Sequence, residues 1–383
     1  MPGRSPPEAS PDIVVVATAA RGLAAAARRA GLRPIALDLF ADADTRALAV
    51  EAIPLRGTGG LTFDGDDLIE QLGTHAADGT PVVIGSGFED QLALIEAIET
   101  RFALIGNGSR VIARLKQPQA FAALLATLSI PHPRLFFGPA PEGIATLEKR
   151  IGAAGGWHVR PAQVPRDEHW YLQEFLPGRT VSALFLGNGT ASVLLGFSEQ
   201  WCAPSPDAPY RYGGAAGPVA LPAQMAHDIE AALARIVAAT GMVGLASADI
   251  ILGADGWHLI EVNPRPGATL DVFDHDPMPP LLRLHVEACE GRLPAPGTLP
   301  DLTAGPAHAA AVFYAPAPFE MRLDPLPDWV ADRPATGTRL QIGEPVCTLL
   351  AEGRDVTDAR RLLAERQKDL WTRLGEAHRK AAE

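Results

Sequence analysis

The chain has 383 residues, 47% of them apolar, so it can bury a sizeable core in two or three lobes and does not have a disordered composition. Its formal net charge of −12 repels phosphate backbones, which argues against nucleic-acid binding as the main task but leaves room for one bound nucleotide. The three cysteines lack metal-ligand spacing and predict a reducing, cytoplasmic compartment, and no apolar run reaches the roughly 18 residues of a membrane span.

The N-terminal part alternates short apolar runs with helical patterns. The first 12 residues lack the apolar segment of a signal peptide and are expected to form a frayed tail. The expected elements are strands at 13–17, 34–37 and 81–84 and helices at 21–30 and about 90–100. This alternation predicts a parallel sheet covered on both faces. The turn after the first strand lacks G-x-G-x-x-G, which disfavours a dinucleotide site, although the loop 85–89 follows a strand's carboxyl end and can contact a ligand.

In the remainder of the chain, short strand patterns with glycine turns replace the regular alternation of strand and helix, which predicts an α+β arrangement. Several short strands with glycine turns are expected between residues 146 and 197. The other expected elements are a helical stretch at 109–128, an edge strand at 134–137, a helix at 228–240, strands at 248–252, 258–262 and 309–314, and a final charged helix from about residue 356.

Two carboxylates and an amide form the most informative group of residues. Asp249 lies in the run ASADIIL, and Glu261 and Asn263 lie in LIEVNPRPG, two apart on one strand and therefore on one face. The hairpin turn between these runs can bring Asp249 beside them. This oxygen set suits Mg²⁺ bridging nucleotide phosphates, and Arg265, fixed between two prolines, can meet a transferring phosphoryl oxygen. The alternative is a solvent-facing edge hairpin, which does not require an Arg between prolines.

These residues resemble the ATP-grasp superfamily, in which an acid, a hairpin and a Glu-x-Asn pair hold magnesium. The likeness extends over about residues 106–274. More narrowly, the chain resembles the predicted ATP-dependent carboligases related to biotin carboxylase and the tyramine–glutamate ligase type. The resemblance implies an N-terminal parallel α/β lobe (1–105), an ATP-grasp domain of two α+β lobes (106–290) and a small β-rich C-terminal extension with a helix (291–383). It also implies that ATP binds with Mg²⁺, or Mn²⁺, at Asp249, Glu261 and Asn263.

The resemblance further implies which residues contact the phosphates. Lys149 precedes a glycine-rich loop, as does the family lysine on the α- and β-phosphates. Lys116 matches the second family lysine, ahead of the turn Ile-Pro-His-Pro, with Arg114 as its competitor. A solvated surface charge is the ordinary alternative for a single lysine. Loop backbone amides can fold over phosphate oxygens and exclude water as a lid, which assigns the glycines Gly152, Gly155 and Gly156.

The run YLQEFLPG resembles the family's adenine hinge, near residues 173–178. Its residues expected to frame the purine are Gln173, Glu174, Phe175 and Leu176. An ordinary strand entering a turn would have the same sequence.

The sequence departs from the family pattern in three places, one of which is a compact glycine loop that is followed closely by Arg160. Arg179 and Thr180 stand where many members carry an acid on the ribose hydroxyls, so ribose recognition is in doubt. Ser247 stands where amide-forming members carry an Arg, so Arg265 or Arg211 must take over stabilisation of an anionic intermediate.

The function implied is an ATP-dependent carboxylate–amine ligase that forms an acyl phosphate and releases ADP and phosphate. Joining glutamate or another amino acid to an amine in cofactor biosynthesis is one such reaction, with Arg265 and Lys149 as catalytic residues. The alternatives are a bicarbonate-dependent carboxylase of the biotin carboxylase-like type and a nucleotide-binding protein without turnover. The expected partners are small-molecule carboxylates and amines, without nucleic acid or membrane, and a homo-oligomer is left open.

Overall fold

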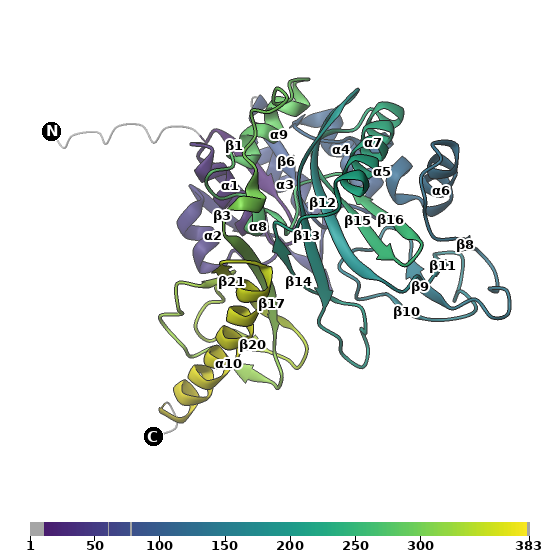
Figure 1. The fold of residues 1–383 in the computed structure, drawn as a ribbon. Coiled ribbons are helices and arrows are strands. Elements are labelled where there is room, and N and C mark those ends of the chain that lie inside the picture. The colour runs from purple at the N-terminus through teal and green to yellow at the C-terminus, as the bar shows by residue number, and fades with distance from the viewer. Residues whose placement is uncertain (1–10, 60, 77–78, 381–383) are drawn as a thin grey trace.

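The computed structural model describes residues 11–59, 61–76 and 79–380, which form three connected parts (Figure 1). They are an N-terminal α/β unit, a small antiparallel sheet and a large antiparallel sheet that continues into the C-terminal segment. Most of the expected tail, residues 1–10, lies outside the described residues. Within the described ranges, no helix combines the length and apolarity needed to cross a bilayer.

The N-terminal unit is built on a parallel sheet, as predicted. The strand order is β3-β2-β1-β6-β7, and all four pairings are parallel. All four residues of β1 are buried, as expected for a strand covered on both faces. Its elements are β1 (Ile13–Val16), α1 (Arg21–Arg29), β2 (Pro34–Asp38), α2 (Ala43–Leu48), β3 (Glu51–Pro54), β4 (Gly57–Gly59), β5 (Thr62–Phe63), α3 (Gly65–His75), β6 (Pro81–Ile84), α4 (Leu92–Arg101) and β7 (Ala103–Leu104).

The helical stretch expected at 109–128 is divided into two helices. These are α5 (Ser109–Lys116) and α6 (Pro118–Thr127), and Gln117 between them has an extended backbone. Proline has no N–H to donate and disfavours a helical conformation in the residue before it, so Pro118 begins a new helix. The break places Lys116 at the end of α5.

A small antiparallel sheet follows in the order β10-β9-β11-β8. The expected edge strand is β8, which lies at one edge. Lys149 is the penultimate residue of β9, directly before the glycine-rich loop. The strands are β8 (Leu135–Phe136), β9 (Thr146–Arg150), β10 (Arg160–Pro161) and β11 (Trp170–Glu174).

The large sheet has eight strands in the order β16-β15-β12-β13-β14-β17-β21-β19. The pairing of β14 with β17 joins the strands before residue 290 to those after it, so the sheet is continuous across that point. The strands are β12 (Arg179–Asn188), β13 (Ser192–Cys202), β14 (Tyr212–Gly217), β15 (Val243–Gly253), β16 (Gly256–Asn263), β17 (Ala307–Tyr314), β19 (Val330–Ala331) and β21 (Pro345–Gly353).

Helices cover both faces of this sheet. Helix α7 (Ala223–Thr240) buries Ile229, Leu233 and Ile236 in a cluster that includes Val181 and Phe185 of β12. Helices α8 (Leu270–Phe273) and α9 (Leu281–Cys289) belong to a different cluster, which also contains apolar residues of β12 and β15.

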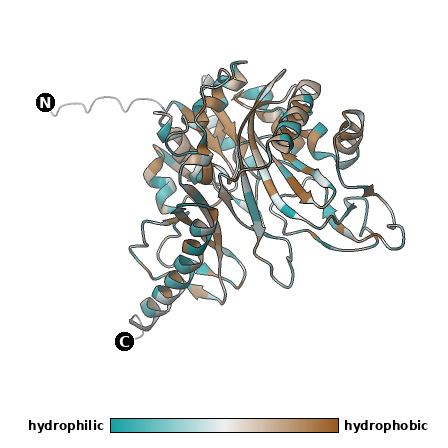
Figure 2. Ribbon diagram, in the orientation of Figure 1, coloured by the Kyte–Doolittle hydropathy of each residue, from teal (hydrophilic) through white to brown (hydrophobic). Residues whose placement is uncertain are grey.

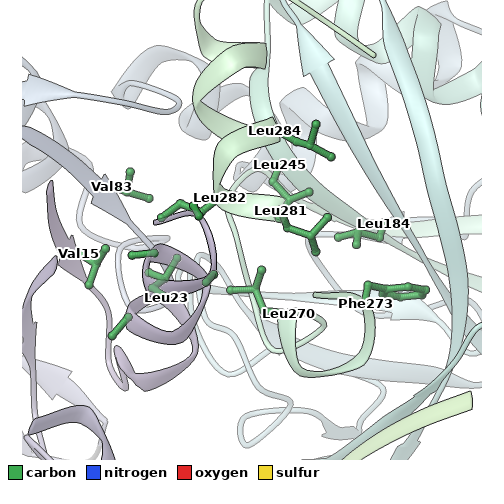
Figure 3. Packing of buried hydrophobic residues seen from close by; sticks show 14 of the residues in the cluster. Val15, Leu23, Val83, Leu184, Leu245, Leu270, Phe273, Leu281, Leu282 and Leu284 are labelled. Atoms are coloured by element: carbon green, nitrogen blue, oxygen red, sulfur yellow. The ribbon is translucent and has the colours of Figure 1, made fainter. Parts of the chain in front are cut away.

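That second cluster joins the N-terminal unit to the large sheet (Figure 3). Val15 of β1 and Leu23 of α1 belong to the same buried group as Leu245 of β15 and Leu281 of α9. Burial of such side chains is worth roughly 1.5–3 kcal/mol each relative to exposure, before the entropy of ordering is counted. The two parts of the molecule therefore share this buried cluster.

The C-terminal segment ends in helix α10 (Val356–Lys380), which is mostly hydrophilic in Figure 2. Its buried residues Leu363, Leu370 and Leu374 cluster with apolar side chains of β17 and β21. The expected strand at 309–314 and the final helix are both confirmed. The remaining elements are β18 (Phe319–Glu320), β20 (Arg339–Leu340) and the short 3₁₀ helix at Leu302–Ala304.

Candidate active site

The hairpin of β15 and β16 brings the three predicted metal ligands together. Asp249 lies opposite Glu261 and Ser247 lies opposite Asn263, with a bulge between Asp249 and Ile250. The Asn263 amide nitrogen donates to Asp249 Oδ2 at 3.3 Å. Because residues two apart on a strand share a face, Glu261 and Asn263 both turn toward the same space.

Asp249 is held from two further strands. Ser182 Oγ of β12, its direct cross-strand neighbour, donates to Asp249 Oδ1 at 2.8 Å, and Gln200 Nε2 of β13 donates to the same oxygen at 3.2 Å. Burial raises the pKa of Asp249, and the nearby Glu261 carboxylate raises it further against these hydrogen bonds. A cation between the two carboxylates would relieve this repulsion.

Lys116 supplies such a positive charge. Its Nζ donates to Asn263 Oδ1 at 2.7 Å and forms an ion pair with Glu261 Oε1. The Lys116 side chain is only 5% exposed, so the pair is largely shielded from water on the lysine side. Burial opposes ionisation of Glu261, but Lys116 and Lys149 outweigh it and hold the pKa of Glu261 below its ordinary value.

This oxygen set fits a hard divalent cation. Glu261 and Asn263 already direct oxygens at one ammonium group, which stands in for a positive ion. Among the described residues, no cluster of three or more His, Cys, Asp or Glu side chains is placed to hold a metal. An ion here would therefore use the Asn263 amide oxygen as its third protein ligand, with Asp249 and Glu261 as the charged ones.

Lys149 approaches the same carboxylates from the small sheet. It lies opposite Tyr171 on β11, and burial lowers its pKa against the attraction of Glu261 and Asp249. Among the described residues, its ammonium has no hydrogen-bond partner within the protein, unlike that of Lys116. A partly buried ammonium without a direct partner is suited to an anionic ligand.

The glycine-rich loop is closely fitted to its surroundings. Gly152, Gly155 and Gly156 all have positive φ, between 72° and 74°. A Cβ at Gly152 would come within 2.8 Å of the Asp90 side chain, and a Cβ at Gly156 would collide with the Tyr210 carbonyl. The loop therefore requires glycine for its conformation and for its close approach to neighbouring backbone.

Arg265 contacts the N-terminal unit. Its Nε and one terminal nitrogen donate to Glu89 Oε1 at 2.9 and 2.7 Å, and the other oxygen of Glu89 accepts the N–H groups of Gly87 and Phe88 at 3.0 Å. Burial alone would raise the pKa of Glu89, but Arg265 and Lys116 lower it to about 2. The sequence indicated only that the loop 85–89 can contact a ligand. It did not indicate the pairing of Glu89 with Arg265, because 176 residues separate the two.

The predicted adenine hinge lies between β11 and β12. Gln173 is buried, whereas the Glu174 carboxylate forms an ion pair with Arg134 at 2.6 Å and the Phe175 ring is 40% exposed. The Phe175 N–H donates to the Ala145 carbonyl at 2.8 Å. Within the described residues, the Leu176 N–H has no such backbone partner, which leaves it available to a purine edge.

The departures at Arg179 and Ser247 have defined surroundings. Arg179 pairs with Glu199 at 3.7 Å, and Ser247 is nearly buried opposite Asn263. Arg211 donates to the Gly343 carbonyl at 3.0 Å and lies 3.7 Å above the Tyr314 ring. Arg211 therefore connects the loop before β14 to the C-terminal segment.

Trp157 and His158, which directly follow the glycine-rich loop, also have defined surroundings. The Trp157 ring meets Tyr314 edge-on, with centroids 5.6 Å apart. Burial lowers the pKa of His158 to about 4, which keeps its ring neutral near pH 7.

One surface hollow lies apart from the predicted metal-binding and phosphate-binding residues. It has a volume of about 470 Å³ and is lined by Arg179, Glu199, the segment 218–220 and the start of α10. The candidate site lies instead between β9, β16, α5 and the loop 85–90. These elements carry the two lysines, the candidate metal ligands Glu261 and Asn263, and Glu89.

Comparison with known proteins identifies the class. Residues 122–269 match the family described as ATP-grasp domain, a range that contains the glycine loop, the hinge, Asp249, Glu261, Asn263 and Arg265. The match covers less than half of the chain, so the ATP-grasp domain is identified for these residues. No curated protein matches the sequence significantly.

Solved structures show the same fold over nearly the whole chain. An L-amino acid ligase from Bacillus licheniformis aligns with a TM-score of 0.68 at 13% identity, over 94% of this chain and 98% of that one. A biotin carboxylase from Campylobacter jejuni, in a β,γ-ATP complex, aligns with 0.67 at 13%, over 90% and 88%. N5-carboxyaminoimidazole ribonucleotide synthetase from Thermotoga maritima aligns with 0.64 at 13%, over 94% and 98%. At these identities the likeness is one of fold.

Proposed function

We propose that the protein is an ATP-dependent ligase that activates a carboxylate by phosphorylation and transfers the acyl group to an amine. The observation that carries this proposal is the convergence of Asp249, Glu261 and Asn263 with two lysines at one point of an ATP-grasp domain. Two carboxylates and an amide oxygen suit Mg²⁺, and the lysines suit the phosphates of ATP.

The residues take separate roles in this proposal. Asp249, Glu261 and Asn263 hold Mg²⁺, or Mn²⁺, which when bound offsets the negative charge of the phosphates. Lys149 and Lys116 bind phosphate oxygens. The backbone of the hinge at 173–176 reads the adenine edge, and the glycine-rich loop covers the phosphates with its amides.

The reaction proceeds in two displacements. An oxygen of the acid substrate attacks the γ-phosphorus of ATP in line, the bond to the β-phosphate oxygen breaks, and ADP and an acyl phosphate form. The amine nitrogen then attacks the acyl carbon, phosphate leaves with its bonding electrons, and the amine loses a proton. Arg265 and Lys149 stabilise charge on the transferring phosphoryl oxygens, and closure of the loop over the site limits hydrolysis.

The substrate class is a small carboxylic acid and a small amine. The fold shared with an L-amino acid ligase supports an amino acid, glutamate included, as one of the two, joined to an amine in the manner of cofactor-biosynthetic ligases. The fold shared with biotin carboxylase and N5-carboxyaminoimidazole ribonucleotide synthetase favours a second candidate, a carboxylase that phosphorylates bicarbonate. The same residues would serve both reactions.

A screen for ADP release tests the proposal. The full chain is incubated with ATP, Mg²⁺ and pairs of amino acids and aromatic or aliphatic amines, with Glu261→Gln as the inactive control. A ligase releases ADP with a particular pair and forms a product whose mass is that of acid plus amine minus water. ADP release that requires bicarbonate, with label from bicarbonate in the product, identifies the carboxylase instead. No acid- or bicarbonate-dependent ADP release across the screen rejects both.

A further inference from the structure

The position of Lys116 bears on the order in which ligands enter the site. Its ammonium lies between Glu261 Oε1 and Asn263 Oδ1, with the Asn263 contact at 2.7 Å. The side chain reaches this point from the last residue of α5, which ends where Pro118 begins the next helix. The Lys116 side chain is 5% exposed and that of Glu261 is 33% exposed, so the lysine is shielded from water while the carboxylate remains partly accessible.

The contacted oxygens are the same ones that a metal ion requires. Asn263 has a single amide oxygen, and its nitrogen is already directed at Asp249 Oδ2. An ion bound by both Glu261 and Asn263 would lie in the space that the ammonium occupies. Two positive charges in contact repel each other strongly in a partly desolvated site, so Lys116 and a divalent ion would compete for these oxygens.

Asp249 is organised differently. Its carboxylate is fixed by Ser182 and Gln200 and receives no direct contact from Lys116. One metal ligand is thus preset by the sheet, while the other two are held by a lysine. Lys149, the second nearby ammonium, is not hydrogen-bonded to any of the three among the described residues.

We infer that Lys116 is an internal counter-cation that holds Glu261 and Asn263 in place until nucleotide phosphates draw it away and free both for the metal. This inference rests on the proposed function, because it takes the site to bind metal and nucleotide together. Lysine has a flexible four-carbon stem and a compact charge, so it can exchange carboxylate for phosphate by rotamer changes alone. Metal without nucleotide must compete with Lys116, whereas nucleotide removes the competitor.

The test measures each ligand alone for wild type and Lys116→Met. Free Mn²⁺ is counted by its paramagnetic resonance signal without nucleotide, and an ATP analogue is titrated by calorimetry in excess chelator without metal. We expect Lys116→Met to bind Mn²⁺ about tenfold tighter and the analogue about tenfold weaker, because it removes a competing cation and a phosphate ligand. These opposite shifts are the signature of a lysine that exchanges between the two ligands.

Three further variants serve as controls for the Lys116→Met measurement. Arg114→Met removes a positive charge from the same helix at an exposed position, where the arginine bonds the Ala239 carbonyl, and should leave Mn²⁺ binding unchanged. Lys116→Arg keeps the charge and should bind Mn²⁺ as weakly as wild type. Adding Glu261→Gln to Lys116→Met should abolish the gain, which ties it to this site. Thermal unfolding of each variant establishes that it is folded.

Several results would overturn the inference. Mn²⁺ binding that is unchanged or weakened in folded Lys116→Met would mean that the lysine does not compete with metal. If Lys116→Met bound the ATP analogue as tightly as wild type does, the lysine would not exchange between carboxylate and phosphate. If Arg114→Met gained as much Mn²⁺ affinity as Lys116→Met, the effect would come from net charge alone. The ligase proposal fails separately: if the opposite shifts occur while no substrate pair releases ADP, the counter-cation stands and the ligase does not.

Discussion

The β15–β16 hairpin and the glycine-rich loop bring groups to the same site by opposite means. In the hairpin, Asp249 is fixed by side chains from two neighbouring strands of an eight-stranded sheet. The loop follows a strand of the small sheet, and Gly155 accepts a hydrogen bond from the Tyr212 N–H at 2.9 Å. Ligands for a compact ion need fixed geometry, whereas a cover for phosphates must admit its ligand. The predictions below test this contrast.

The largest effect is expected in the hairpin. Glu261→Gln and Asn263→Asp should each lower the rate of ADP release by about 10²–10³-fold, because each alters a proposed ligand of the metal ion that would offset the phosphate charge. Glu261→Gln should change thermal stability little, since the glutamine can keep a hydrogen bond to Lys116. Rates are measured at limiting Mg²⁺. If both variants keep near-native rates under that condition, the metal assignment is wrong.

The Glu89–Arg265 pair should dominate the acid response. Because the pKa of folded Glu89 is lowered from 4.5 to about 2, its contribution to stability is present above about pH 4.5 and is lost as the pH falls toward 2. Glu89→Gln should lower the free energy of unfolding at pH 7 by up to about 3 kcal/mol and flatten its decline in acid. Urea unfolding from pH 2.5 to 7 measures both. A variant with the wild-type acid profile would show that the pair contributes nothing.

A smaller effect is expected at the end of β9. Lys149→Ala should weaken ATP binding about tenfold, because it removes a point charge from the phosphates while leaving the metal ligands in place. Calorimetric titration with an ATP analogue and Mg²⁺ measures the change. Arg150→Ala is the matched control, since Arg150 is exposed and lies 3.7 Å from Asp90. Unchanged affinity in Lys149→Ala would transfer the phosphate role to Arg160 or Lys116.

The smallest effect is a change in loop dynamics. Within the described residues, the N–H groups of Gly152, Gly155 and Gly156 have no backbone partner, so they should exchange quickly without nucleotide and slowly with an ATP analogue and Mg²⁺. Hydrogen exchange over 152–157 tests this, with the amides of β15 as the unchanging reference. Equal protection in both states would make the segment a rigid turn and remove the contrast with the hairpin.

Local patterns predicted much of the fold because they depend on short-range physics. The β-branched run of β1, the amphipathic pattern of α7 and the hairpin through Asp255 and Gly256 all formed where expected, within a few residues. The division of the expected helix at Pro118 was missed, although proline disfavours a helical conformation in the residue before it. One continuous helix was expected because the apolar periodicity extends on both sides of this proline.

The contacts between distant segments were not predictable in the same way. Sequence placed Glu261 and Asn263 on one face, and the structure has them there with Lys116 between their oxygens. That the lysine would contact the expected metal ligands depends on the angle of α5 against β16, which periodicity does not encode. The pairing of Glu89 with Arg265 depends likewise on how the N-terminal unit sits on the large sheet.

The junction between β14 and β17 has a consequence for the solubility of shortened chains. β14 reads YGGAAG, and its residues 214–217 pair with Ala309, Ala310, Ala311 and His308 of β17. A chain cut near residue 290 would leave this strand as a bare edge without a charged or proline residue to block pairing with another molecule. The C-terminal segment covers this edge, and we expect its removal to yield insoluble protein.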